Sequence, residues 1–141
     1  MKKTYSGSCH CGRVKFEADI DFTEGTGKCN CSICAKLRHW GIIIKPDAFR
    51  LLQGERELTE YHFKSDDPQF AWKRGSSEFC RHCGIRPFGR GDVPEIGGAF
   101  VSVNIAALDD VDVSEFFAGP LRYADGRHDN WQNTPAETRH L

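Results

Sequence analysis

The residues best suited to chemistry in this sequence are its seven cysteines, which lie in three tight clusters. The clusters are Cys9 and Cys11; Cys29, Cys31 and Cys34; and Cys80 and Cys83. Thiolates separated by one or two residues can reach the same soft metal ion, and zinc is the usual ion for such sets. Four thiolates close the coordination shell of zinc, whereas three leave one position for water or a substrate. Seven ligands therefore predict one structural zinc and a second zinc that does chemistry.

A disulfide framework is the main alternative for a chain so rich in cysteine. The odd number of cysteines and their short spacings count against it. The first residues, MKKTYS, include no apolar segment of a secretion signal, and no apolar run approaches the roughly 20 residues of a membrane span. We therefore expect a cytoplasmic metal-binding protein with no membrane partner.

The charge balance bears on the class of partner. The 141 residues include 19 Lys and Arg against 20 Asp and Glu, for a formal net charge of -1, and no block of like charge stands out. Proteins that bind nucleic acid or anionic membranes usually carry a basic patch or stripe. A nucleic-acid zinc ribbon is therefore disfavoured, and we expect no nucleic-acid partner.

The sequence around the cysteines suggests how they divide. The first and last clusters each end in glycine, Gly12 and Gly84. A metal knuckle needs a tight turn there, often with positive φ, which glycine adopts without steric cost. The middle cluster has no such glycine and is expected to lead into a short helix over residues 32–37, whose N-terminal end favours thiolates.

Pairing like with like gives a definite ligand set for each site. The structural site then takes Cys9, Cys11, Cys80 and Cys83, and the open site takes Cys29, Cys31 and Cys34. The residues alone do not force this division, because a mixed set such as Cys9, Cys11, Cys29 and Cys31 also supplies four ligands. We expect the structural zinc to be held tightly and the second zinc to be easier to lose.

The elements that must position these clusters are mostly strands. Apolar and polar residues alternate clearly over 14–19 and 99–105, directly after the first cluster and after the last. Further short strands are expected over residues 41–45, 49–52, 58–63 and 70–72, and helical turns over 32–37 and 113–117, the last with Ser114 as its cap. The pattern predicts a mostly β, single compact domain of short antiparallel strands with zinc knuckles, over residues 1–131. Residues 132–141 are expected to form a loosely held tail.

The order of the motifs resembles the glutathione-dependent formaldehyde-activating enzyme family, to which centromere protein V belongs. The motifs are G-x-C-x-C-G over residues 7–12, C-x-C-x-x-C over 29–34 and F-C-x-x-C-G-I-R-P-F over 79–88. Residues 103–112 and an ending with Asp125 and Gly126 near Trp131 add to the resemblance. It spans about residues 5–131, nearly the whole chain.

The resemblance implies a fold, a metal content and an activity. In this family the first and last cysteine pairs hold a structural zinc, and the middle three cysteines hold a catalytic zinc. The implied fold is β-rich and similar to that of a small zinc-bearing accessory protein of Rab GTPases. The implied activity is that of a carbon–sulfur lyase that forms or cleaves S-hydroxymethylglutathione.

A three-thiolate zinc is suited to binding another thiol, which places glutathione and an aldehyde among the expected partners. Glutathione carries two carboxylates, for which arginine is the better bidentate partner, so Arg38 and Arg86 are the candidate substrate-binding residues. Histidines inside the knuckles, His10 and His82, are expected to be exposed and not to bind metal. The alternative is a zinc-stabilised binding module without catalysis, whose three-cysteine site takes a protein ligand or metal.

Overall fold

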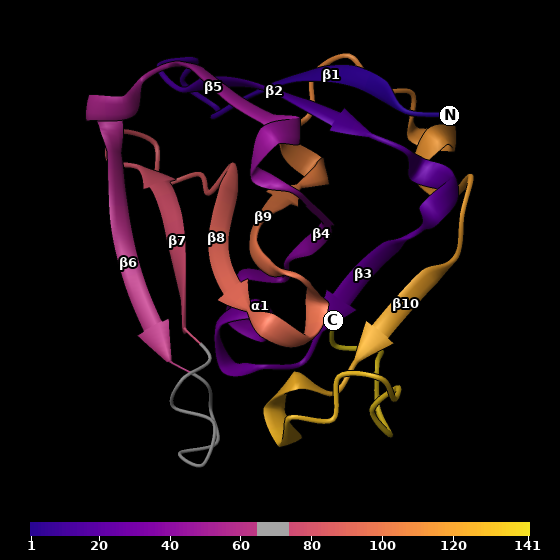
Figure 1. Cartoon of the computed structure of the whole chain (residues 1–141). Helices are drawn as coiled ribbons and strands as arrows, with labels where there is room; N and C mark the ends of the chain where they lie inside the picture. Colours follow the sequence, from indigo (N-terminus) through magenta and orange to yellow (C-terminus); the bar gives the residue numbers. More distant parts are fainter. Residues whose placement is uncertain (65–73) are drawn as a thin grey trace.

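The computed structural model describes residues 1–64 and 74–141, so the strand predicted over residues 70–72 lies outside the described residues. The fold is built from two β-sheets, because apolar side chains alternate along the strands and give each sheet one face to bury. Figure 1 shows the smaller sheet lying across one end of the larger one.

The strands are short, and nearly all neighbours are antiparallel. The smaller sheet contains β1 (Lys3–Ser8), β2 (Lys15–Ile20) and β5 (Phe49–Gln53) in the order β1-β2-β5. The larger sheet contains β3 (Thr26–Cys29), β4 (Trp40–Ile44), β6 (Leu58–Lys64), β7 (Arg74–Cys80), β8 (Phe88–Val93), β9 (Gly98–Asn104) and β10 (Leu121–Ala124). Its order is β10-β3-β4-β9-β8-β7-β6, and β10 runs parallel to β3.

Helical structure is limited to short turns between the strands. The α-helix is α1 (Ser32–Leu37). The 3-10 turns are η1 (Phe22–Glu24), η2 (Pro46–Ala48), η3 (Glu55–Glu57), η5 (Pro94–Ile96), η6 (Ile105–Ala107), η7 (Val113–Phe117) and η8 (Gly126–His128). Among the described residues no helix is long and apolar enough to cross a membrane.

The main core lies between the two sheets. Phe16 of β2 and Phe49 of β5 stack with ring centroids 5.4 Å apart, and Phe49 meets Phe88 of β8 at 4.5 Å. Val101 and Val103 of β9 are fully buried in the same cluster. Aromatic pairs of this kind add to the stability that apolar burial provides. The core thus packs β2 and β5 of the smaller sheet against β8 and β9 of the larger one.

The structure confirms the mostly β, single-domain fold and most of its predicted elements. Strands predicted over residues 14–19, 41–45, 49–52, 58–63 and 99–105 correspond to β2, β4, β5, β6 and β9. The helical turns predicted over 32–37 and 113–117 are α1 and η7. The bounds differ by one residue at several ends: β2 begins at Lys15, β4 ends at Ile44 and β9 ends at Asn104. β9 stops there because the Asn104 side chain accepts a hydrogen bond from the backbone N–H of Ala106 and starts η6.

The predicted cap of the 113–117 turn was wrong by two residues. Asp112, not Ser114, is the N-cap: its carboxylate accepts from the backbone N–H of Ser114 at 2.8 Å. The Glu115 carboxylate accepts in return from the Asp112 backbone N–H at 3.1 Å. This capping box satisfies donors at both ends of the first turn, which a serine inside the turn cannot do.

The last residues of the chain make hydrogen bonds with β3 and with the residue that follows β10. The backbone N–H of Asp125 donates to the carbonyl of Asn133 at 3.0 Å, and Lys28 Nζ donates to the carbonyl of Leu141 at 3.0 Å. The division into a domain over residues 1–131 and a loosely held tail over 132–141 stays a prediction.

Candidate metal centres

The first and last cysteine clusters meet at one end of the molecule. Cys9 and Cys11 follow β1, and Cys80 is the last residue of β7, with Cys83 in the turn after it. Their four sulfur atoms all lie within 4.8 Å of one another. The Sγ atom of Cys11 is 3.6 Å from both Cys9 Sγ and Cys80 Sγ. The structure therefore brings together the four cysteines predicted as one set, and not the mixed alternative.

The two turns that carry these cysteines share one backbone pattern. In the first, Gly12 has φ 80° and its N–H donates to the carbonyl of Cys9 at 3.1 Å. In the second, Gly84 has φ 77° and its N–H donates to the carbonyl of Cys80 at 2.8 Å. The predicted positive φ at both glycines is confirmed. Each turn closes through a backbone conformation that glycine adopts without steric cost.

The middle cluster forms a second centre at the start of α1. Cys29 ends β3, Cys31 is the N-cap of α1, and Cys34 lies within the helix. Their three sulfur atoms also lie within 4.8 Å of one another. The backbone N–H of Cys31 points at Cys29 Sγ over 3.3 Å. The short helix predicted over residues 32–37, in place of a glycine turn, is confirmed.

The thiols of this centre oppose one another's ionisation. Hydrogen bonds from Cys29 and Cys34 lower the pKa of Cys31. The same contact with Cys31 raises the pKa of Cys29, and hydrogen bonds with Cys29 and Cys31 raise that of Cys34. One thiolate is thus easily formed, but three at this spacing repel. A soft cation removes that cost, so the three sulfurs form a donor set that can hold a metal ion.

Two side chains that lie beside this centre are joined to each other. Arg86 Nη1 donates to His39 Nδ1 at 3.1 Å, and Arg86 Nε donates to Ser77 Oγ of β7 at 2.7 Å. His39 Nε2 lies 2.9 Å from Ser102 Oγ of β9. The backbone N–H of His39 donates to the carbonyl of Cys34 at 3.1 Å, which ties this network to the cysteines.

The protonation of this network follows from its geometry. The arginine side chain has only donors, so His39 Nδ1 must accept its hydrogen bond. The ring proton of the neutral histidine is then on Nε2, which donates to Ser102 Oγ. Burial, with the charge of Arg86 second, lowers the pKa of His39 to about 3. Arg86 is therefore a charged group held in place by a neutral histidine. Burial lowers the pKa of Arg86, and the nearby Cys34, Glu78 and Cys31 act in the opposite direction.

The two predicted arginines occupy different environments. Arg86 is half-buried and anchored, whereas Arg38 is exposed in the left-handed conformation (φ 50°) that ends α1. Among the residues described, Arg86 forms no salt bridge with a carboxylate. The charge of Arg86 thus interacts with the cysteines and with the buried Glu78 without a carboxylate in direct contact.

A segment near the C-terminus also supports the middle centre. Asn30, between Cys29 and Cys31, is buried, and its Nδ2 donates to Asp125 Oδ1 at 2.7 Å. The backbone N–H of Arg127 donates to Asn30 Oδ1 at 3.0 Å. Both ends of the amide are therefore used to attach residues 125–127 to the cysteine loop. Figure 1 shows this part of the chain, in yellow, beyond the end of β3 and β10.

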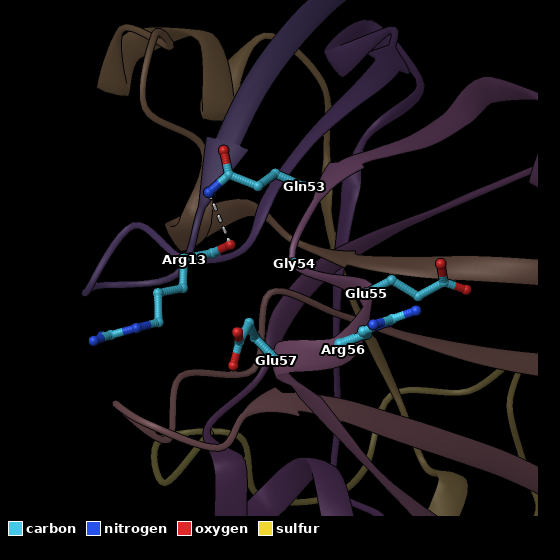
Figure 2. Close-up of a pocket in the computed structure, with 6 residues that line it drawn as sticks. All are labelled: Arg13, Gln53, Gly54, Glu55, Arg56 and Glu57. Carbon is cyan, nitrogen blue, oxygen red and sulfur yellow. Dashed lines mark hydrogen bonds between the residues drawn. The ribbon is translucent and has the colours of Figure 1, made fainter.

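A depression on the surface lies beside the four-cysteine centre, next to Arg13. Figure 2 shows its lining, Arg13 and residues 53–57, around a volume of about 430 Å³. Two of these lining residues are joined by a hydrogen bond of 3.2 Å, from Gln53 Nε2 to the carbonyl of Arg13. Charges of both signs line it, and no residue of the three-cysteine centre contributes. We therefore do not assign the reaction to it.

Sequence reasoning identified the cysteines but missed several of their neighbours. It considered His39, with Lys36 and Arg38, as a nearby cation, whereas the structure makes His39 a neutral hydrogen-bond acceptor. It did not single out Asn30, Ser77 or Ser102. A polar residue between two cysteines was a usable signal for Asn30. No pattern predicted the two serines, since their role depends on the pairing of β7, β8 and β9. The histidines of the knuckles, His10 and His82, lie outside the sulfur cluster, as expected.

Comparisons with known proteins give a family and a fold. A family model described as glutathione-dependent formaldehyde-activating enzyme matches residues 4–119. A crystal structure of a protein from Rhodobacter sphaeroides is similar to this one, with a TM-score of 0.63 and 24% sequence identity. The alignment covers 83% of this chain and 99% of the other. This second likeness shows the fold.

Proposed function

Because the chain belongs to the glutathione-dependent formaldehyde-activating enzyme family, as its motifs predicted, we propose that it is a carbon–sulfur lyase acting on glutathione–aldehyde adducts. The observation that carries the proposal is the three-cysteine centre, whose sulfurs lie within 4.8 Å of one another. Three thiolates occupy three of the four positions that zinc usually has. The fourth position is suited to the sulfur of a substrate.

The donor sets fit two zinc ions of different roles. Cys9, Cys11, Cys80 and Cys83 would hold the structural ion, and Cys29, Cys31 and Cys34 the catalytic one. When bound, the catalytic ion would favour the thiolate form of a thiol at neutral pH. We expect a chelator to remove the catalytic ion before the structural one.

The reaction requires few groups beyond an activated sulfur. The sulfur of glutathione attacks the carbonyl carbon of formaldehyde, so that a carbon–sulfur bond forms and the thiol proton ends on the former carbonyl oxygen. The product is S-hydroxymethylglutathione, and the reverse reaction breaks the same bond and returns the proton to sulfur. The residues of this chain then contribute mainly by binding and orienting the two reactants.

Arg86 is the best-placed residue to bind a carboxylate of glutathione. Its contacts with Ser77 and His39 use two of the five N–H groups of the guanidinium, which leaves others for a ligand. Those contacts also restrict its rotamers, so less entropy is lost when a carboxylate binds. Arg38 is the second predicted cation; it is exposed, so we expect a smaller contribution from it.

Calorimetry and turnover on the same zinc-loaded samples test this proposal. Arg86→Ala should weaken glutathione binding by about tenfold or more, because a charge-assisted hydrogen bond is worth roughly 1.5–3 kcal/mol. It should leave the affinity for 2-mercaptoethanol, which has no carboxylate, almost unchanged. Arg38→Ala is the matched control and should weaken glutathione binding about threefold or less.

The outcomes separate the enzyme from the alternative. Turnover of S-hydroxymethylglutathione by the wild type, lost in Cys31→Ser, supports the lyase. Absence of turnover with any glutathione–aldehyde adduct, in protein that carries both zinc ions, would contradict it and leave the zinc-stabilised binding module. Equal affinity of the wild type for glutathione and 2-mercaptoethanol would rule out carboxylate recognition by either arginine.

A further inference from the structure

The segment after β10 reaches back to the three-cysteine centre, and we propose that its Trp131 limits the size of the organic group that the site accepts beside the substrate sulfur. The inference rests on the proposed function, because it takes a thiol or thiol adduct as the ligand of that centre.

The ring of Trp131 lies against the cysteine centre through Gly126. A methyl group built on Gly126 would be 2.5 Å from Cys29 Sγ and 2.6 Å from the nearest carbon of the indole. The position of this methyl group is therefore in contact with both the sulfur and the ring. Such close approach is possible only because residue 126 has no side chain. The benzo edge of the indole is thus directly beside a cysteine of the site.

The ring is also fixed at its other end. Trp131 Nε1 donates to Asp129 Oδ1 at 2.6 Å, and the backbone N–H of Asp129 donates to the carbonyl of Gly126 at 3.2 Å. Asp129 has φ 53°, the conformation that closes this turn. The segment itself is attached to the cysteine loop through Asn30. The indole is therefore held between two fixed points and cannot easily move aside.

A rigid apolar surface at this position has a defined chemical effect. The edge of an aromatic ring carries partial positive charge and packs well against sulfur, so it tolerates thiolates nearby. Trp131 is also 45% exposed, so the ring is not enclosed by the protein. An organic group on the substrate sulfur that extends past Cys29 meets this surface. A small group such as hydroxymethyl fits there, whereas a longer chain or an aryl group meets the ring.

The first experiment compares glutathione adducts of formaldehyde and butyraldehyde on the zinc-loaded wild type, Trp131→Ala and Trp131→Phe. Trp131→Ala should raise the ratio of kcat/KM for the butyraldehyde adduct over the formaldehyde adduct by at least about tenfold, the discrimination that a few methylenes produce in an apolar site. Trp131→Phe keeps a ring and should stay within about threefold of the wild-type ratio. An unchanged ratio in Trp131→Ala, with both zinc ions present, would overturn the inference while leaving the lyase proposal intact.

The second experiment keeps the inference testable if no adduct is turned over. The same three proteins are titrated with 2-mercaptoethanol and with thiophenol, which differ in the bulk next to sulfur. Trp131→Ala should bind thiophenol about tenfold more tightly relative to 2-mercaptoethanol than the wild type does. That result without turnover would support the size limit and reject the lyase. The same relative affinities in both proteins would reject the size limit. Trp40→Phe is the matched control. Trp40 donates to Thr26 and packs on Phe116, and its substitution should alter neither ratio.

Discussion

At the scale of single residues, His39 shows how one side chain links the cysteine centre to the sheet. Its backbone N–H bonds the carbonyl of Cys34, and its ring lies between Arg86 and Ser102. The ring is neutral because burial and the neighbouring guanidinium lower its pKa to about 3. A protonated His39 could not accept from Arg86, so its neutrality is a condition for holding that arginine in place.

His39→Phe should therefore weaken the hold on Arg86 without removing a cysteine ligand. We expect zinc content to stay at the wild-type level and glutathione affinity to fall about fivefold, because the lost hydrogen bond contributes roughly 1 kcal/mol. Metal analysis and calorimetry on one sample measure both. Ser102→Ala removes the bond on the other nitrogen and serves as control, with a smaller loss. Wild-type glutathione affinity in His39→Phe would show that Arg86 needs no such support.

At the scale of elements, the end of β3 and the turn η8 meet at Gly126. Because Gly126 touches Cys29 Sγ and the ring of Trp131, even a methyl group there has no room. Gly126→Ala should displace either the cysteine or the indole. We expect loss of about one equivalent of zinc or a marked fall in its affinity, measured by competition with a chromophoric chelator. The first equivalent, held by the four-cysteine centre, should remain.

A second glycine provides the control for this substitution. Gly27 lies in β3, two residues before Cys29, and a methyl group there would meet only the carbonyl of Arg122, at 3.8 Å. Gly27→Ala should therefore retain both zinc ions. If Gly126→Ala also retains both at wild-type affinity, the close packing of residue 126 on Cys29 does not constrain the site.

The pairing of β2 with β5 gives the smaller sheet a pH-dependent contribution. Arg50 of β5 donates to both carboxylate oxygens of Asp19 in β2, at 2.8 and 2.9 Å, and Thr4 Oγ1 donates to one of them at 2.7 Å. The hydrogen bonds from Arg50 and then Thr4 hold the pKa of Asp19 well below its usual range. A depressed pKa means that the folded state gains stability above the pKa of the unfolded chain, near 3.9, and loses it as pH falls further.

Asp19→Asn should consequently lower the thermal midpoint at pH 7 by roughly 2–4 °C, the shift that about 1 kcal/mol produces in a domain of this size. The difference from wild type should shrink as the pH falls below about 4, where the carboxylate begins to lose its charge in the unfolded chain. Thermal unfolding followed by circular dichroism at several pH values measures this. Glu17→Gln is the control on the same strand, since Glu17 makes one contact with Arg50, at 3.2 Å. A pH-independent difference for Asp19→Asn would contradict the assignment.

At the scale of the whole molecule, the four-cysteine centre connects the two sheets. Cys9 follows β1 of the smaller sheet and Cys80 ends β7 of the larger one. Both are buried beside Val14 in a small second core. A structural zinc site contributes on the order of 10–16 kcal/mol of apparent binding free energy, as much as a whole domain's stability. The middle centre makes no such connection, because its three cysteines belong to one short stretch of chain.

The two centres should therefore respond differently to loss of a ligand. Cys83→Ser should unfold or aggregate the chain, because folding depends on the closed site. Cys34→Ala should give a folded protein that lacks one zinc and all activity toward thiol adducts. Circular dichroism with metal analysis on the same samples distinguishes them. If Cys83→Ser melts like the wild type while Cys34→Ala collapses, the structural and catalytic roles are reversed.

The sequence by itself determined the features that depend on neighbouring residues. Clustered cysteines indicated metal binding, the glycines after Cys11 and Cys83 indicated turns of positive φ, and alternation over residues 14–19 and 99–105 indicated strands. These signals are local, because a turn or a strand imposes its period on adjacent positions. They also carried the family resemblance, since ordered motifs are read along the chain.

The tertiary structure alone decided which distant residues meet. The pairing of β7 with β8 and of β8 with β9 brings Ser77 and Ser102 to the network of Arg86, and the parallel pairing of β10 with β3 returns Gly126 to Cys29. Strand order and register depend on the packing of the whole core, which no short pattern encodes. For this reason the cysteines were predictable from the sequence, whereas the residues that surround and limit their site were not.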